Sequence, residues 1–161
     1  MIALRAANRL WYWRREKMVR KIEQNDIQQN EVYQIMQIWL EGNIEAHDFV
    51  PKDYWISNYP LVQKQILQAD IYVYETDGKI QGFVGMIDDY LAGIFVDRNC
   101  RSFGIGHQLL NHVKSIHPVL ELHVYQKNRR AVEFYLGEGF SVTSESVDGE
   151  TGELEYTMSW G

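Results

Sequence analysis

Residues 91–110 read LAGIFVDRNCRSFGIGHQLL, and this stretch is typical of a strand, a glycine-containing loop and a helix in succession. The apolar run at 91–96 predicts a buried β-strand, and the segment at about 104–117 predicts a helix that stops before Pro118. A loop with two glycines joins them. Glycine lets backbone amides approach an anion closely, and a helix N-terminus adds a partial positive charge. The junction therefore predicts a pyrophosphate site, with a glycine-rich connection that binds nothing as the alternative.

The glycine loop lacks two familiar nucleotide-binding signatures. Gly104 and Gly106 are not followed by the third glycine that a dinucleotide fingerprint requires. No Gly-Lys-Ser or Gly-Lys-Thr follows, which excludes the phosphate loop of a nucleoside triphosphatase. The pattern that remains is Arg-x-x-Gly-x-Gly over residues 101–106. By itself, this pattern supports an anion site without identifying the anion.

The composition predicts one soluble globular domain with an acidic body. The chain has 161 residues, enough for one core, and no apolar run approaches the roughly 18 residues of a membrane span. Its one cysteine, Cys100, excludes an internal disulfide and a cysteine-rich zinc site, and favours a reducing cytoplasm. The formal net charge of −6 argues against nucleic acid as the main partner and favours a cationic acceptor such as an amine.

Residues 1–17 form a basic segment that contrasts with the rest of the chain. They carry a net charge of +4, so the total of −6 leaves −10 on the other 144 residues. The segment lacks the apolar stretch and cleavage site of a secretory signal. We expect it to be an upstream start or an added extension outside the fold, with a docked helix or a surface anchor as alternatives. The domain is expected to span residues 18–161, without a membrane partner.

The order of the expected elements is that of an α/β sheet with helices on its faces. A strand at 18–24 precedes a helix at 27–42, which is expected to end near Gly42. A second helix opens at Pro51 and is kinked or interrupted at Pro60. The remaining expected elements are two strands joined by a hairpin turn at Asp77-Gly78, the strand and helix around the glycine loop, a strand at 119–125, a helix from Asn128 to near Gly137, and a last hairpin at about 140–160.

Two segments in this order resemble the acetyl-coenzyme A motifs of the GCN5-related N-acetyltransferases (GNAT). IFVDRNCRSFGIGHQLL at 94–110 is similar to the motif that binds the cofactor, and ELHVYQKNRRAVEFYLGEGF at 121–140 is similar to the segment that follows. The resemblance covers most of residues 19–160, and EGNIEAHDFVPKDYW and TMSW resemble small bacterial acetyltransferases. It implies a mixed, mainly antiparallel sheet with helices on both faces and a cofactor cleft where the fourth and fifth strands splay apart.

The same resemblance implies which residues would hold acetyl-coenzyme A. Backbone groups of Ile94, Phe95 and Val96 would pair with the pantetheine arm as a neighbouring strand would. Asn128 would contact the cofactor near its pantetheine or thioester end. The amides of one loop would take the pyrophosphate, namely those of Arg101, Ser102, Phe103, Gly104, Ile105 and Gly106.

Acetyl transfer to an amine needs a base for the amine and an acid for the departing thiolate. The resemblance places Tyr135 beside the sulfur, and a phenol with a pKa of about 10 can protonate the thiolate of a thiol with a pKa of about 8.5. Some relatives carry a glutamate where this chain has His123, so the base is open. His123 is favoured, Glu121 is less favoured, and a bound water is the alternative.

The expected reaction is a direct attack of an amine on acetyl-coenzyme A in a ternary complex. The acceptor would be a protein lysine, a protein N-terminus or a small cationic amine, and His47 and Asp48 are candidates for binding it, because the family shapes its acceptor site there. Three histidines at five-residue steps spread around one helix, so we expect no metal. The alternative is a non-catalytic coenzyme A-binding sensor or interaction module. The protein is expected to be a monomer or a homodimer.

Overall fold

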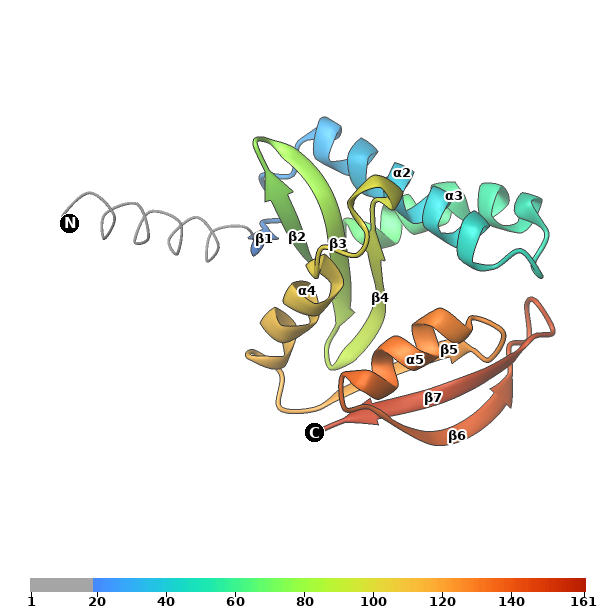
Figure 1. Cartoon of the computed structure of the whole chain (residues 1–161). Helices are drawn as coiled ribbons and strands as arrows, with labels where there is room; N and C mark the ends of the chain where they lie inside the picture. Colours follow the sequence, from blue (N-terminus) through green and yellow to red (C-terminus); the bar gives the residue numbers. More distant parts are fainter. Residues whose placement is uncertain (1–18) are drawn as a thin grey trace.

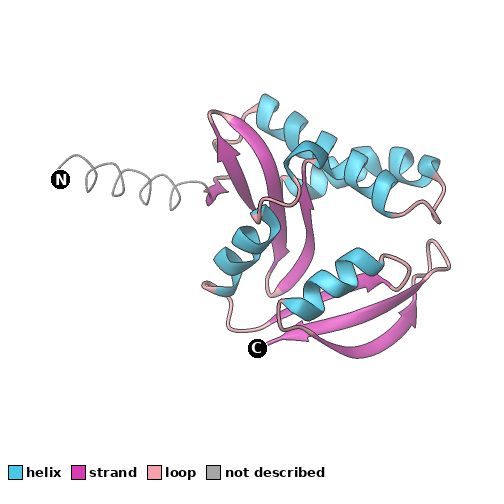
Figure 2. Cartoon of the chain, in the orientation of Figure 1, coloured by secondary structure: helices cyan, strands magenta, loops and turns pink. Residues whose placement is uncertain are grey.

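A mixed sheet of seven strands runs through the middle of the structure (Figures 1 and 2). The computed structural model describes residues 19–161, so the expected extension at 1–17 lies outside the described residues. The strands are β1 (Val19–Ile22), β2 (Asp70–Thr76), β3 (Lys79–Ile87), β4 (Tyr90–Val96), β5 (Leu120–Tyr125), β6 (Ser141–Val147) and β7 (Leu154–Trp160). Their spatial order is β1-β2-β3-β4-β5-β7-β6, and every pair is antiparallel except β4 and β5.

In residues 19–161, two α-helices pack on each face of the sheet, which confirms the predicted fold class (Figure 1). One face carries α2 (Gln29–Ala46) and α3 (Lys52–Ile66), and the other carries α4 (Ile105–Lys114) and α5 (Arg129–Gly137). A 3-10 turn, η1 (Arg98–Cys100), lies between β4 and α4. Within residues 19–161, no helix has the length and apolar content needed to cross a membrane.

The alternation of β2 explains why the molecule has two cores. Ile71 and Val73 are buried in the cluster formed by α2 and α3, whereas Tyr72 and Tyr74 are buried in the cluster formed by α4 and α5. Successive side chains of a strand point to opposite faces, so one apolar strand serves both layers. The central sheet is thereby fixed from both sides.

The sheet is interrupted between β4 and β5. Their register contains one pair, Tyr90 with Glu121, and the amide of Glu121 also donates to the carbonyl oxygen of Asp89 at 3.0 Å. β5 is then held by six register pairs with β7. Because β4 and β5 part after their first residues, the facing backbone of β4 stays open, as the family resemblance implied.

Three details of the sequence interpretation are wrong. The helix expected to end near Gly42 continues to Ala46. Gly42 serves packing instead of ending the helix, because a Cβ there would lie only 3.2 Å from the Phe95 ring. Of the two alternatives for Pro60, interruption of α3 is wrong, since the residue lies on the exposed side, where water can satisfy the carbonyl of Ile56, while the kink stays a prediction. The expected buried strand at 91–96 is buried only at Leu91: Ala92 is exposed and residues 93–96 are half-buried.

Leu109 tests how much of the stability rests on the packing of α4. Its side chain is fully buried against the sheet, so Leu109→Ala should lower the free energy of unfolding by about 2–5 kcal/mol. Urea unfolding measures this change. The matched control is Leu61→Ala on α3, which is 54% exposed and should stay within about 0.5 kcal/mol of the wild type. Equal losses in the two variants would contradict the assigned core.

Candidate functional site

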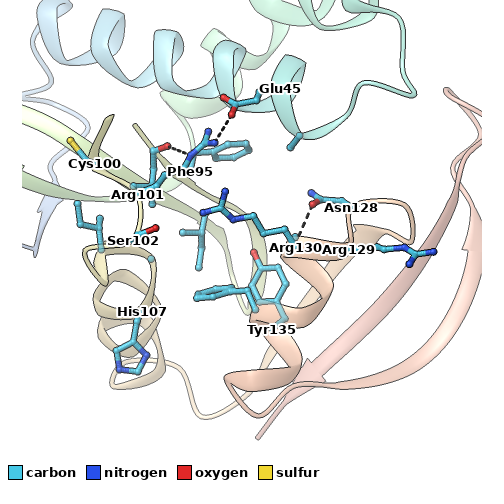
Figure 3. Close-up of a pocket in the computed structure, with 18 of the residues that line it drawn as sticks. Glu45, Phe95, Cys100, Arg101, Ser102, His107, Asn128, Arg129, Arg130 and Tyr135 are labelled. Atoms are coloured by element: carbon cyan, nitrogen blue, oxygen red, sulfur yellow. Dashed lines mark hydrogen bonds and ion pairs between the residues drawn. The ribbon is translucent and has the colours of Figure 1, made fainter. Parts of the chain in front are cut away.

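A cavity of about 700 Å³ opens where β4 and β5 part (Figure 3). Its walls come from β4, the glycine loop with the start of α4, the end of α2 and the start of α5. Phe103, predicted to bind the cofactor, is not part of the lining and is 76% exposed. The other residues predicted from the family resemblance to bind the cofactor all line the cavity: Ile94, Phe95, Val96, Arg101, Ser102, Gly104, Ile105, Gly106 and Asn128.

The glycine loop leaves backbone amides unpaired at the start of α4. Asp97 caps η1 by accepting the amide of Asn99 at 2.8 Å, and the chain then turns through positive φ at Ser102 and Gly104. Gly104 is the N-cap of α4, and the first helical bond runs from the amide of Gln108 to the carbonyl of Gly104. The amides before Gln108 therefore have no partner within the helix. Such a turn at a helix start is a common anion-binding arrangement.

Cationic side chains surround the same opening, and the sequence interpretation missed most of them. Lys127, Arg129 and Arg130 flank the N-terminus of α5 and line the cavity. In Figure 3, Arg130 reaches across the cavity toward Arg101, while Arg129 points away. The run KNRR was the available signal, because three cations within four residues adjoin a helix start. With two helix N-termini, these side chains make the mouth of the cavity positive.

Arg101 already has an anionic partner. Its Nη1 donates to Oε1 of Glu45 at 2.8 Å, and its Nε donates to the carbonyl oxygen of Val96 at 3.4 Å (Figure 3). Glu45 lies near the end of α2 and was not singled out from the sequence. The ion pair thus joins α2 to the glycine loop across the cavity mouth, where a phosphate would compete with the carboxylate for the same guanidinium.

Tyr135 is buried beside the cavity and its hydroxyl points into it (Figure 3). Burial raises the pKa of the phenol, and this effect outweighs the opposing effect of the Ile94 backbone. The Tyr135 side chain therefore stays protonated at neutral pH. A protonated phenol can donate a proton to an atom held in the cavity.

His47 also lines the cavity, next to Asn128. The two side chains are joined through Nε2 of His47 and Nδ2 of Asn128, which lie 3.1 Å apart. Burial lowers the pKa of His47 to about 4, so the imidazole is neutral at physiological pH. Asp48 is exposed and is not part of the lining. Of the two candidates for acceptor binding, His47 therefore lines the cavity and Asp48 does not.

His123 and Glu121 lie on the opposite face of β5 from the core that contains Tyr135, and neither lines the cavity. Leu120, Leu122 and Val124 point toward Tyr135 in the core, whereas His123 and Glu121 are exposed. The Nδ1 atom of His123 lies 3.7 Å from Oε1 of Glu155, and its ring packs edge-on against Tyr90.

The chemistry of the lining fits acetyl-coenzyme A. The phosphates match the amides of the glycine loop and the guanidinium groups of Arg101 and Arg130, and the amide-bearing arm matches the open backbone of β4. The buried Tyr135 lines the same cavity and brings a protonated phenol to it. Among the described residues, no three His, Cys, Asp or Glu side chains are grouped so that they could hold a metal ion.

Known proteins are similar to this chain in sequence and in fold. An acetyltransferase (GNAT) domain model matches residues 68–142. The peptidyl-lysine N-acetyltransferase YiaC of Escherichia coli (strain K12) is 37% identical over 137 residues, which make up 84% of this chain and 94% of that protein. The solution structure of apo-form YjaB from Escherichia coli has a TM-score of 0.75 at 26% identity and covers 88% of this chain and 95% of the other.

A Bacillus anthracis acetyltransferase, solved in complex with acetyl coenzyme A, shares the fold over a shorter stretch. Its TM-score is 0.53 at 20% identity, covering 57% of this chain and 61% of the other. The strand–loop–helix junction, the parted strands and the match to YiaC over nearly the whole of that relative lead to one conclusion. The chain belongs to the GNAT family of acetyl-coenzyme A-dependent N-acetyltransferases.

Proposed function

We propose that the protein transfers the acetyl group of acetyl-coenzyme A to the side-chain amine of a lysine in a protein. The observation that carries this proposal is the cavity between β4 and β5, with anion-binding groups at its mouth and the buried Tyr135 beside it. The choice of lysine is supported by the relative YiaC, named a peptidyl-lysine N-acetyltransferase. A net charge of −6 favours a cationic acceptor protein.

In the proposed complex, the glycine loop and Arg101 bind the pyrophosphate, and Arg130 adds a second guanidinium. Backbone groups of Ile94, Phe95 and Val96 pair with the pantetheine arm and align the thioester with the gap between the strands. The bound acetyl coenzyme A of the Bacillus anthracis relative supports this assignment of the cofactor. The Asn128 amide, at the start of α5, holds the arm near the thioester.

Tyr135 acts as the general acid in this proposal. The lysine nitrogen attacks the thioester carbonyl, the new C–N bond forms and the C–S bond breaks, so the sulfur leaves as a thiolate. Because the raised pKa of Tyr135 keeps its proton at neutral pH, the phenol can transfer that proton to the sulfur.

His123 accepts the proton of the incoming ammonium group. It lies two residues further along β5 than Glu121, which pairs with Tyr90 at the closed end of the gap, so His123 is the better placed of the two. The Nδ1 atom of His123 lies 3.7 Å from Oε1 of Glu155, which helps to orient the ring. His47 is a poor base by comparison, since burial lowers its pKa to about 4.

Acetylation of defined peptides tests the acceptor class. A peptide with a blocked N-terminus and one lysine should become acetylated, and flanking arginines should give a higher kcat/KM than flanking glutamates. Mass spectrometry measures the product, and the same peptide with arginine in place of lysine is the control. Acetylation of small polyamines without any peptide product would overturn the choice of a protein lysine.

The Tyr135→Phe variant tests the general acid. Losing the phenolic proton should lower kcat by about 100-fold, while the dissociation constant of coenzyme A stays close to the wild-type value. Steady-state kinetics and calorimetry measure the two quantities. Tyr156→Phe is the matched control, because Tyr156 packs against the same core without lining the cavity and should keep full activity. An unchanged kcat in the Tyr135 variant would remove the assigned role.

The Glu45→Gln variant tests the competition for Arg101. Removing the carboxylate 2.8 Å from the guanidinium should tighten coenzyme A binding by about two- to fivefold at low salt, and the gain should shrink as the ionic strength rises. Glu41→Gln, one turn earlier on an exposed part of α2, controls for the change in net charge. Weaker binding in the Glu45 variant would mean that the carboxylate positions Arg101 instead of competing for it.

A further inference from the structure

The helix cap at Asn128 fixes the orientation of its side-chain amide. Asn128 is the N-cap of α5, and its Oδ1 accepts the backbone N–H of Ala131 at 3.3 Å. A backbone amide can only donate, so the oxygen must face Ala131 and the nitrogen must face the other way. The Nδ2 atom is thereby turned toward His47, 81 residues earlier in the chain. The capping bond alone settles which end of the amide each neighbour meets.

The same geometry fixes the tautomer of His47. The Nδ2 group donates, so Nε2 of His47, at 3.1 Å, must accept and cannot carry a proton. The neutral ring then carries its hydrogen on Nδ1, a buried atom with no hydrogen-bond partner among the described residues. The bond to Asn128 is therefore the one polar contact that the described chain offers to this ring.

The imidazole is held in place by aromatic side chains on three sides. It stacks on Trp55 with ring centroids 5.2 Å apart, and it meets Phe49 and Tyr125 edge-on at 5.7 and 5.0 Å. These contacts come from the segment after α2, from α3 and from β5. The enclosure keeps the ring neutral, because burial lowers the pKa to about 4. A fixed, neutral ring is a reliable hydrogen-bond acceptor.

We propose that His47 is a positioning residue for the acetyl donor: it holds the Asn128 amide so that the second hydrogen on Nδ2 is presented to a carbonyl of the pantetheine arm. One Nδ2 hydrogen goes to His47, and the other remains for the cavity that both residues line. The cap fixes only Oδ1, so without this acceptor the amide plane can rotate about the capping bond and move Nδ2 away from the ligand. This inference rests on the proposed binding of acetyl-coenzyme A.

Calorimetric titration with coenzyme A tests the coupling between the two residues. His47→Phe keeps the aromatic packing but removes the acceptor, so binding should weaken by about three- to tenfold. His47→Gln restores an acceptor oxygen at a similar reach and should bind within about twofold of the wild type. In the Asn128→Ala background, His47→Phe should produce no further loss, because the partner is already absent.

Separate results distinguish the failure of the two proposals. If wild-type protein does not bind coenzyme A, the proposed function fails first. If it binds and His47→Phe binds equally well, or if the two substitutions are additive, the positioning role is overturned. Equal losses in His47→Phe and His47→Gln would indicate a packing role and would overturn it as well. An independent test is the ¹⁵N spectrum of the wild-type imidazole at neutral pH, which should show Nε2 unprotonated; a protonated Nε2 would contradict the inference.

Discussion

β4 and β5 stop pairing after one register pair, and the position of the cavity and of every residue that lines it follows from this interruption. One register pair joins them, and beyond it β4 offers an unpaired backbone edge to the cavity. An exposed strand edge is normally a liability, because its amides and carbonyls lack partners. Here each strand is secured on its other side, β4 by β3 and β5 by β7, so the gap stays open without loosening the sheet. A ligand that pairs with β4 completes the sheet locally.

Signals carried by a few neighbouring residues made much of the fold predictable. The Asp77-Gly78 turn adopts positive φ at both residues, as its sequence indicated, and Asn128 caps α5 as expected. The element order is also as predicted, because apolar periodicity depends on the immediate neighbours. The end of α2 was not predictable in this way. Whether Gly42 stops a helix or permits close packing depends on Phe95, which lies far away in sequence.

The candidate site was predictable to the extent that the family motifs are contiguous. The glycine loop and the Asn128–Tyr135 segment line one cavity, as the resemblance implied. Glu45 and Arg130 were missed, because a charged residue on a helix is more often solvated than functional. The contact between His47 and Asn128 joins residues 81 positions apart, and no local pattern encodes it. The roles of His123 and Glu121 stay predictions, since both lie outside the lining.

The Asn128 side chain accepts one hydrogen bond and donates another, and this limits which residue types can occupy its position. Serine, threonine and aspartate cap helices about as well as asparagine does, so the stability of α5 alone would leave this position open to several residue types. Aspartate has no hydrogen to offer to an acceptor, and the shorter hydroxyl side chains extend less far from the backbone than the amide does. The requirement to accept from Ala131 while donating to His47 leaves asparagine as the residue that serves both. Substitution of Asn128 is therefore restricted by His47, which follows a helix on the opposite face of the sheet.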